Sequence, residues 1–331
     1  MNITLVMAGD EEGGLEKHVV ELANGLQARG HTVTVIAHAK YQERLAKVNF
    51  IAVDLSKSRR NIGVLYQLYK VIKILNADVI HVHGNKAAAM VSPLLPFLQL
   101  KSVATLHSRK KNTKVFKRFN AVIAVSPNAA EVLEHPHKHV VLNGIEPPVL
   151  DENIPKHEPA VVLAVGRLVP VKGFDVLIEA WQGIQNAELW IVGDGFEHEK
   201  LQGLITQFNL QHSVKLLGFR SDIVELMQQA SLYVMSSHYE GCPYTMIEAL
   251  LCRIPMVSTA VGAMTMVLPK QYLCPVNDAK ALNQQISHSL NNLESVQQNF
   301  QSVFEFAAKE LVLDGMLQNI EKIYDEVLSA K

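Results

Sequence analysis

Residues 1–37, MNITLVMAGDEEGGLEKHVVELANGLQARGHTVTVIA, indicate the fold at the start of the chain. Residues 3–7 and 33–37 are short apolar runs rich in Val, Ile and Leu, as expected for strands buried on both faces. The segment between them repeats apolar residues at helical spacing: Leu15, Val19, Leu22 and Leu26. A strand, a helix and a second strand in this order form the repeating unit of a parallel sheet.

The same alternation continues along the chain with one interruption. Further strands are predicted at residues 79–82, 103–106 and 122–125, and then at 161–165, 189–192, 214–217, 232–235 and 256–258. Residues 144–159, GIEPPVLDENIPKHEP, contain four prolines and no periodic apolar face, which is typical of an interdomain linker. Residues from about 278 onward are predicted to be helical.

We therefore predict an α/β protein with two Rossmann-like, doubly wound parallel-sheet domains that face a central cleft. The predicted divisions are an N-terminal domain at residues 1–145, a linker at 146–159, a C-terminal domain at 160–310 and a final helix at 311–331. Ligands of such sheets bind beyond the carboxyl ends of the strands, so the loops that follow the strands are the candidate sites.

The composition excludes several other classes of protein. Of the 331 residues, 48% are hydrophobic and 19% are charged, so the chain is neither disordered nor collagen-like. Its 3 cysteines include no CxxC pair, which argues against a disulfide framework or a zinc knuckle. No apolar run reaches the roughly 18–20 residues that span a bilayer, and the first residues lack a basic segment. A cytoplasmic location is therefore expected.

Two cations flank a glycine-containing loop after the strand at residues 161–165. The stretch VGRLVPVKG at residues 165–173 places Arg167 and Lys172 on this loop. Such a pair can bind phosphate, because Arg binds it bidentately and Lys acts as a point charge. The alternative is a tight turn that carries two solvated surface cations.

Two carboxylates flank a predicted helix start in the stretch EGCPYTMIEA at residues 240–249. Pro243 suits the first helical position, so the N–H groups from Gly241 to Tyr244 would be free to bind an anion or a polar ligand. Glu240 and Glu248 can each accept hydrogen bonds from the hydroxyls of a sugar or a ribose. In the alternative interpretation, one Glu complements the helix dipole and the other is simply exposed.

A third stretch, GDEEGGLEKH at residues 9–18, follows the first strand and leads into the first helix. Glycines at this position let a ligand approach the backbone closely. The spacing differs from GxGxxG, and the second strand is followed by His38 rather than by an acidic residue. A nicotinamide dinucleotide site is therefore disfavoured.

Together these stretches resemble the pattern of glycosyltransferase family 4, which has the GT-B fold. Four motifs carry the resemblance, in order and over nearly the whole chain: GG-x-E-x-H-V-x-x-L-A at residues 13–23, V-G-R-L-x-P-x-K-G at 165–173, V-G-D-G at 192–195 and E-G-x-x-x-x-x-x-E-A at 240–249. The resemblance implies a retaining, metal-independent enzyme without a cofactor. It implies a nucleotide-diphosphate sugar as the donor, and a UDP-sugar is favoured.

The resemblance also implies roles for individual residues. Arg167 and Lys172 hold the diphosphate. Glu248 takes the ribose hydroxyls, and Glu240 contacts hydroxyls of the transferred sugar. His107, near the reacting sugar, completes the catalytic group with Glu240, Arg167 and Lys172. The donor-binding residues are Gly14, Arg167, Lys172, Asp194, Gly195, Gly218, Phe219, Gly241, Cys242, Tyr244, Thr245 and Glu248.

On the acceptor side, the resemblance implies Glu16, His18 and His83 of the N-terminal domain, and a final helix that crosses back to that domain. The implied setting is bacterial lipopolysaccharide, capsule or other surface-polysaccharide synthesis, with a glycan or lipid-linked acceptor. Fixed cations can stabilise the charge of a departing diphosphate. Since there is no DxD motif, no metal is expected. In a same-face, retaining reaction the departing phosphate oxygen takes the acceptor proton.

Two further features leave alternatives open. His81 and His83 occupy one face of a predicted strand end, as a metal pair would, but no third ligand is evident and polar packing or cleft lining is favoured. The basic run at residues 109–118 is either a solvated face or a peripheral contact with anionic lipid at the inner face of the cytoplasmic membrane. No recognition motif accompanies these charges, so nucleic-acid binding is not expected.

One segment departs from the family pattern. Residues 261–267 read VGAMTMV, and Met266 stands where the family usually has Glu. Two rival functions share this architecture: a sugar-nucleotide epimerase, and a non-catalytic partner subunit that binds a nucleotide sugar. The first lacks the arrangement of Glu240 and Glu248, and the intact Arg167 and Lys172 argue against the second.

Overall fold

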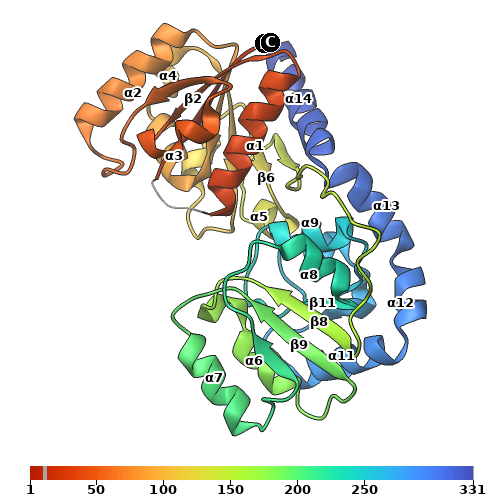
Figure 1. The fold of residues 1–331 in the computed structure, drawn as a ribbon. Helices are drawn as coiled ribbons and strands as arrows, with labels where there is room; N and C mark the ends of the chain where they lie inside the picture. Colours follow the sequence, from red (N-terminus) through yellow and green to blue (C-terminus); the bar gives the residue numbers. More distant parts are fainter. Residues whose placement is uncertain (10–12, 331) are drawn as a thin grey trace. The chain divides into compact units, whose positions relative to one another are not determined.

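The computed structural model describes residues 1–9 and 13–330 and divides into two compact units. Unit 1 comprises Met1–Ile145 and Val312–Lys331, and unit 2 comprises Glu146–Leu311. Each unit is built on one parallel sheet with helices packed against it (Figure 1). The prediction of an α/β protein with two doubly wound parallel sheets is confirmed.

The sheet of unit 1 has seven strands in the described residues, in the order β3-β2-β1-β4-β5-β6-β7. The strands are β1 (Asn2–Met7), β2 (Thr32–Ala37), β3 (Asn49–Ala52), β4 (Val79–His83), β5 (Lys101–Leu106), β6 (Ala121–Ala124) and β7 (Lys138–Val140). The order changes direction at β1 and β4, which is where ligands of doubly wound sheets bind. Strands β1, β4 and β5 are almost completely buried because helices cover both faces.

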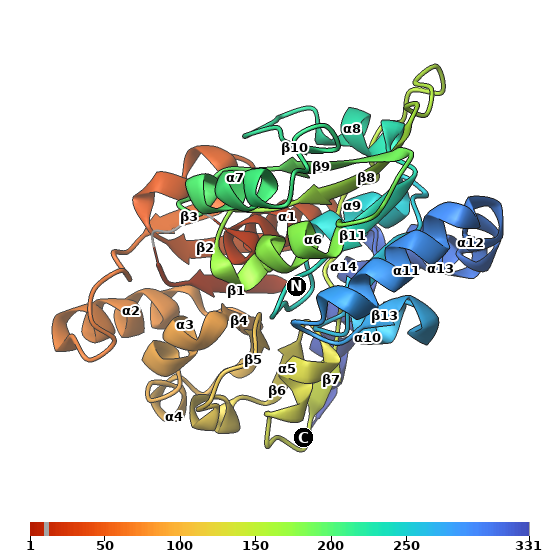
Figure 2. The same cartoon turned by 90° about the horizontal axis from the view of Figure 1, so that it is seen from below.

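The helices of unit 1 form two hydrophobic clusters, one on each face of the sheet. They are α1 (Gly14–Ala28), α2 (Ile62–Leu75), α3 (Gly84–Val91), α4 (Leu95–Leu98), α5 (Pro127–Glu131) and α14 (Leu313–Ser329). Helices α1 and α14 lie side by side and pack with Ile3 and Leu5 (Figure 1). Helices α2 and α3 pack with Val6 on the other face and are seen together in Figure 2.

The final helix, α14, joins unit 1 through a backbone hydrogen bond, close packing and an ion pair. Its first residue, Leu313, donates its N–H to the Ile145 oxygen at 2.7 Å. Gly25 lets α14 lie against α1, because a Cβ at this position would be 2.6 Å from Leu317 Cδ1. The Arg29 guanidinium at the end of α1 binds Glu321 on α14 through three N–H···O contacts of 2.8–3.1 Å.

The sheet of unit 2 has six strands in the described part of the chain, in the order β10-β9-β8-β11-β12-β13. The strands are β8 (Ala160–Val165), β9 (Ala187–Val192), β10 (Val214–Leu216), β11 (Leu232–Met235), β12 (Met256–Thr259) and β13 (Leu273–Cys274). The helices are α6 (Phe174–Ala180), α7 (His198–Gln207), α8 (Ile223–Gln229), α9 (Tyr244–Leu251), α10 (Met264–Val267), α11 (Ala279–Asn291), α12 (Leu293–Asn299) and α13 (Gln301–Glu310). Helices α6, α7 and α11 pack in one cluster around the fully buried Trp181.

Three strands that were not predicted, β3, β7 and β13, lie at edges of the two sheets. Cys242, Cys252 and Cys274 are free thiols and all three are buried. No helix within residues 1–9 and 13–330 is both long and apolar enough to cross a membrane.

Candidate active site

The loops at the carboxyl ends of the unit 2 strands pack against one another through backbone atoms. A Cβ at Gly193 would lie 1.9 Å from the Gly166 oxygen, and one at Gly195 would lie 2.3 Å from another oxygen of the loop after β8. Gly173 has a φ of +61°, and a Cβ there would meet the Ser236 oxygen at 2.4 Å. Because no side chain fits at these distances, the three positions require glycine. The loop that carries both predicted cations is thereby held in place.

Lys172 and Glu240, which belong to separate sequence motifs, form a largely buried ion pair in this region. The Lys172 ammonium donates to Glu240 Oε1 at 2.7 Å, and the two side chains are 19% and 13% exposed. The Ser237 hydroxyl donates to the same oxygen at 2.8 Å. An ammonium group has three donors, so Lys172 can bind Glu240 and a phosphate together. Arg167 lies on the same loop and is exposed.

The two predicted carboxylates do not share a helix. Helix α9 begins at Tyr244, so Glu240 lies in the preceding loop and Glu248 lies within the helix. Pro243 is the capping residue rather than the first helical residue, because its backbone is extended, with a ψ of 135°. Cys242 is buried, and the other predicted donor residues of this segment are half-buried: Gly241, Tyr244 and Thr245.

Ser237 and His238 lie in this region but were not among the residues predicted from the sequence. His238 Nε2 is buried and has no hydrogen-bond partner in the described residues. It lies 2.9 Å from the position of a Cβ on Gly173, beside the loop that carries Lys172. The polar run Ser236-Ser237-His238 between a buried strand and Glu240 is the signal that could have identified these residues. Met266, which stands where the family usually has Glu, is exposed on α10.

The loops after β9 and β10 are joined by a backbone hydrogen bond from the Gly193 N–H to the Gly218 oxygen at 2.8 Å. Asp194 Oδ1 accepts from the Gly195 N–H at 2.7 Å, which orients the carboxylate along its own loop. The next residue of the second loop, Phe219, is 81% exposed. An exposed aromatic ring at the edge of a sheet can stack on a planar base.

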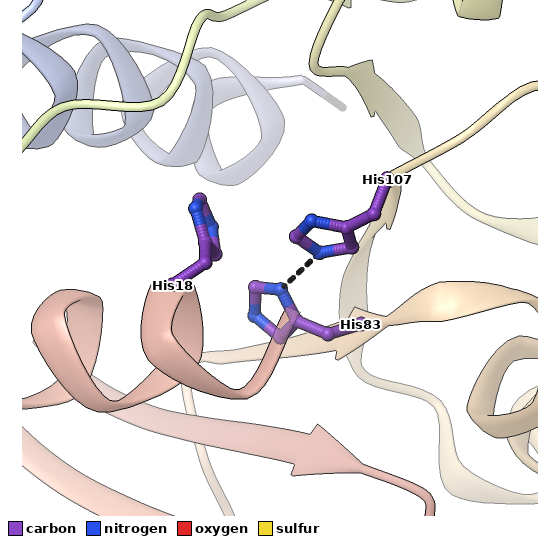
Figure 3. A group of neighbouring side chains, drawn as sticks. All are labelled: His18, His83 and His107. Carbon is purple, nitrogen blue, oxygen red and sulfur yellow. Dashed lines mark hydrogen bonds between the residues drawn. The ribbon is translucent and has the colours of Figure 1, made fainter. Parts of the chain in front are cut away.

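Three imidazoles of unit 1 meet beyond the carboxyl ends of β4 and β5 (Figure 3). His18 lies on α1, His83 ends β4, and His107 follows β5. One nitrogen of each ring lies within 4.8 Å of one nitrogen of the other two. His83 Nδ1 and His107 Nε2 are hydrogen-bonded at 3.3 Å. The sequence suggested no third ligand for His81 and His83, and His81 is not a member of this group; the two imidazoles beside His83 come from elements that are distant in the sequence.

His81, the other histidine of β4, is fully engaged elsewhere. Its Nδ1 lies 2.6 Å from the Tyr324 hydroxyl of α14, and its Nε2 lies 2.7 Å from Thr105 Oγ1. Polar packing, the favoured interpretation of this residue, is therefore correct. His83 belongs instead with His18 and His107, and we call these three residues the histidine group.

Burial keeps the histidine group uncharged at neutral pH. Removal from water lowers the pKa of His18 to about 4. A hydrogen bond with Asn143 raises this pKa, but its effect is smaller than that of burial. Burial likewise lowers the pKa of His83 and of His107 well below the usual range. Neutral imidazoles attract anions only weakly, but each retains one nitrogen lone pair.

The remaining predicted residues of unit 1 lie around the start of α1. Gly14 is the first residue of the helix and is exposed, whereas Glu16 in the first turn is buried. The Glu16 carboxylate would lie 3.3 Å from a Cβ on Gly13, so it sits beside the helix start. Residues 10–12 of the predicted glycine-containing stretch lie outside the described residues.

Comparison with known proteins supports the resemblance. The family model for glycosyltransferase family 4 matches residues 12–148, and the model for glycosyl transferases group 1 matches residues 149–301. An uncharacterised glycosyltransferase of Methanocaldococcus jannaschii is 27% identical over 95% of both chains. The phosphatidylinositol N-acetylglucosaminyltransferase GPI3 subunit of Saccharomyces cerevisiae is 23% identical over 96% of this chain and 78% of that protein.

Solved structures share the fold over the full chain. Anabaena HepE in complex with UDP is 19% identical, with a TM-score of 0.85 over 98% of this chain and 100% of that one. The lipopolysaccharide outer core galactosyltransferase WaaB is 17% identical, with a TM-score of 0.80 over the same shares. With two consecutive family models matching residues 12–301, the chain belongs to the family 4 type of glycosyltransferases, and its two parallel-sheet units have the GT-B fold.

Proposed function

We propose that this glycosyltransferase moves a sugar from a UDP-sugar on unit 2 to a glycan or lipid-linked acceptor on unit 1, with retention of configuration. The observation that carries the proposal is the Lys172–Glu240 ion pair at the carboxyl edge of the unit 2 sheet. It supports the proposal because a cation suited to phosphate contacts a carboxylate that could accept sugar hydroxyls. The solved complex of HepE with UDP supports uracil as the base of the donor.

Arg167 and Lys172 are proposed to bind the diphosphate of the donor. As the bond to the sugar breaks, negative charge develops on the departing phosphate. Fixed donors aimed at such charge each contribute about 3–4 kcal/mol to transition-state stabilisation. Two side-chain cations on a loop held by backbone contacts supply this stabilisation, so the transfer is proposed to need no metal ion at the diphosphate.

The other donor contacts follow from the same edge of the sheet. Glu240 Oε1 is bound by Lys172 and Ser237, which leaves its second oxygen to accept a hydroxyl hydrogen bond from the transferred sugar. Glu248 is proposed to accept the ribose hydroxyls, and Phe219 to stack on the base. The remaining proposed donor contacts of unit 2 are Asp194, Gly195, Gly218, Gly241, Cys242, Tyr244 and Thr245. Gly14, at the start of α1, is the proposed contact from unit 1.

Retention is proposed to proceed by attack on the same face from which the phosphate departs. The phosphate oxygen then takes the acceptor proton, so the reaction needs no carboxylate base. His107, whose imidazole is neutral, is proposed to contact the transferred sugar through a ring nitrogen. Glu16, His18 and His83 are proposed to line the acceptor side.

The proposed setting is the synthesis of a cell-surface polysaccharide such as lipopolysaccharide, at the membrane surface. WaaB, by name a lipopolysaccharide enzyme, shares the fold, and the phosphatidylinositol-specific name of the yeast relative supports a lipid-linked acceptor. Helix α2 exposes Ile62 and Ile74 to 82% and 81%, and the run at residues 109–118 is mostly exposed and basic. Both features suit peripheral contact with anionic lipid.

Donor binding is tested by calorimetry with UDP, GDP and ADP on the wild type and on the double variant Arg167→Ala, Lys172→Ala. We expect UDP to bind most tightly and the double variant to lose its binding. Lys215→Ala is the matched control, because this lysine also forms an ion pair at 2.7 Å but with Glu188 at the start of β9. Unchanged UDP affinity in the double variant contradicts the proposed site.

Turnover is tested with a panel of UDP-sugars and crude lipid-linked acceptors, followed by UDP release and by NMR of the product. We expect the product to have the anomeric configuration of the donor. An inverted product rules out the same-face mechanism, and UDP binding without turnover favours a non-catalytic partner subunit. Flotation with anionic and neutral liposomes tests the membrane contact, and equal partitioning rules it out.

A further inference from the structure

The histidine group has the chemistry of a transition-metal site. His18, His83 and His107 come from a helix, a strand end and a loop, and their rings face a common region (Figure 3). One nitrogen from each ring is within 4.8 Å of one nitrogen from each of the others. Within the described residues the group contains no carboxylate or thiolate. An all-imidazole set suits Zn²⁺, Cu²⁺ or Ni²⁺, whereas Mg²⁺, Ca²⁺ and Mn²⁺ prefer oxygen ligands.

The hydrogen bonding of His18 prepares one nitrogen as a ligand. Its Nδ1 lies 3.1 Å from Asn143 Oδ1, and an amide oxygen can only accept, so Nδ1 carries the proton. The lone pair is therefore on Nε2, which is buried and has no partner among the described residues. A ring N–H donated to an oxygen, with the other nitrogen left for the ion, is the usual state of a metal-binding histidine.

The other two members of the histidine group have matching features. His83 Nδ1 and His107 Nε2 lie 3.3 Å apart. Two nitrogen ligands of a tetrahedral zinc ion are separated by a similar distance, roughly 3.4 Å, when the Zn–N bonds are about 2.0–2.1 Å long. Because His83 faces His107 through Nδ1, its buried Nε2, which has no partner in the described chain, is not the nitrogen that would bind the ion. A buried polar atom without a partner is costly, so the unpartnered Nε2 of His18 favours a ligand at the histidine group.

We propose that His18, His83 and His107 bind one divalent transition-metal ion, for which Zn²⁺ is the best fit. Three protein ligands leave one position of a four-coordinate ion open to water or another ligand. Asn143 is a positioning residue, which acts through His18. The diphosphate is assigned to Arg167 and Lys172 on unit 2, so metal binding can be measured separately from UDP binding. The same three histidines also belong to the proposed function, in which His107 contacts the transferred sugar and His18 and His83 line the acceptor side.

Cobalt provides a readout that is separate from transferase activity. Metal-stripped full-length protein is titrated with Co²⁺, and the visible absorption of the bound ion is recorded. The Co²⁺ is then displaced by Zn²⁺, and the heat of displacement is measured in a calorimeter. We expect one equivalent to bind with an intense tetrahedral spectrum, and Zn²⁺ to displace it. His18→Gln and His107→Gln should each weaken Co²⁺ binding by about 100-fold or more, and Asn143→Leu by about 10- to 100-fold.

His137→Gln is the matched control, because this histidine is exposed and lies outside the group. Its Co²⁺ affinity and spectrum should equal those of the wild type. Circular dichroism establishes that each variant is folded. The inference is overturned if the folded wild type binds no Co²⁺ or Zn²⁺, or if His18→Gln and His107→Gln bind Co²⁺ as tightly as His137→Gln does. Loss of UDP binding would bear on the donor site and leave this result unaffected.

Discussion

Replacing Lys172 by methionine should destabilise unit 2 by leaving a largely buried carboxylate without its cation. Glu240 is 13% exposed, and its Oε1 accepts hydrogen bonds from Lys172 and Ser237. The substitution would leave only the hydrogen bond from Ser237. Breaking a fully buried pair by removing one partner costs about 3–5 kcal/mol. The residual exposure of both side chains lowers this, and we expect about 2 kcal/mol. Glu240→Gln in the same background removes the uncompensated charge and should restore about half of the loss.

The sequence provides a selective probe for this measurement. The protein has 2 tryptophans, Trp181 and Trp190, and both are buried in unit 2. Tryptophan fluorescence during urea unfolding therefore reports on unit 2, and linear extrapolation gives its free energy of unfolding. The wild type, both single variants and the double variant complete a cycle, with an expected coupling of about 1–2 kcal/mol. Lys172→Met should also weaken UDP binding by about 10- to 100-fold, through lost charge-assisted hydrogen bonds.

Two results would refute this reasoning. If Lys172→Met costs less than about 0.5 kcal/mol, solvent already satisfies the carboxylate, and the ion pair contributes little. If Glu240→Gln fails to restore stability in the methionine background, the loss arises from packing of the lysine stem rather than from charge. Lys215→Met serves as the control for loss of an ion pair that is more exposed, and it should cost under about 1 kcal/mol.

Three further substitutions probe the fold. Glu321→Gln should cost unit 1 about 1 kcal/mol at pH 7. Burial opposes ionisation of Glu321, but hydrogen bonds from Arg29 and His31 outweigh it and hold the pKa of Glu321 low. The difference from wild type in far-UV circular dichroism melts should therefore vanish as the pH falls through that lowered pKa. Gly173→Ala should cost unit 2 about 2–4 kcal/mol, measured by tryptophan fluorescence, because its Cβ would meet a backbone oxygen at 2.4 Å. Gly183→Ala is the control, since Gly183 also has a positive φ, of +80°, but has open space around it, and it should cost about 1 kcal/mol. Tyr324→Phe should cost about 1–2 kcal/mol in urea unfolding followed by circular dichroism, because its hydroxyl is bonded at 2.6 Å to a buried imidazole of β4.

The central strands could be predicted from sequence because of where they lie. A strand buried on both faces is mostly apolar at successive positions, and β8 and β9 meet this condition almost throughout. β1 and β4 are equally buried but include polar residues, among them His81 and His83 of β4. The three missed strands pair on one side only. In β7 the outer residues are exposed, and in β3 none of the four is fully buried. Their pairing is imposed by the neighbouring strand, and the local sequence carries little sign of it.

The two sites differed in how much of them could be predicted. The loops of unit 2 follow strands directly, so Arg167, Lys172 and Glu240 were assigned to the same sheet edge from sequence. The ion pair between two of them could not be predicted, because a salt bridge depends on side-chain positions that spacing does not fix. For the histidine group, His83 and His107 each end a predicted strand, and pairing of those two strands would have brought them together. His18 joins them only because β1 lies beside β4.

The physical basis of the two sites also differs. The donor loops of unit 2 are positioned by backbone atoms that meet where only glycine fits, as at Gly173 and Gly193, so their geometry depends on nearby segments of chain. The histidine group is positioned by side chains from remote segments, and its support reaches the last helix. Tyr324 of α14 bonds to His81, whose ring centroid lies 4.1 Å from that of His83. The chain must therefore pass through all of unit 2 and return before the environment of the histidine group is complete, and this dependence gives α14 a role in the site as well as in the core.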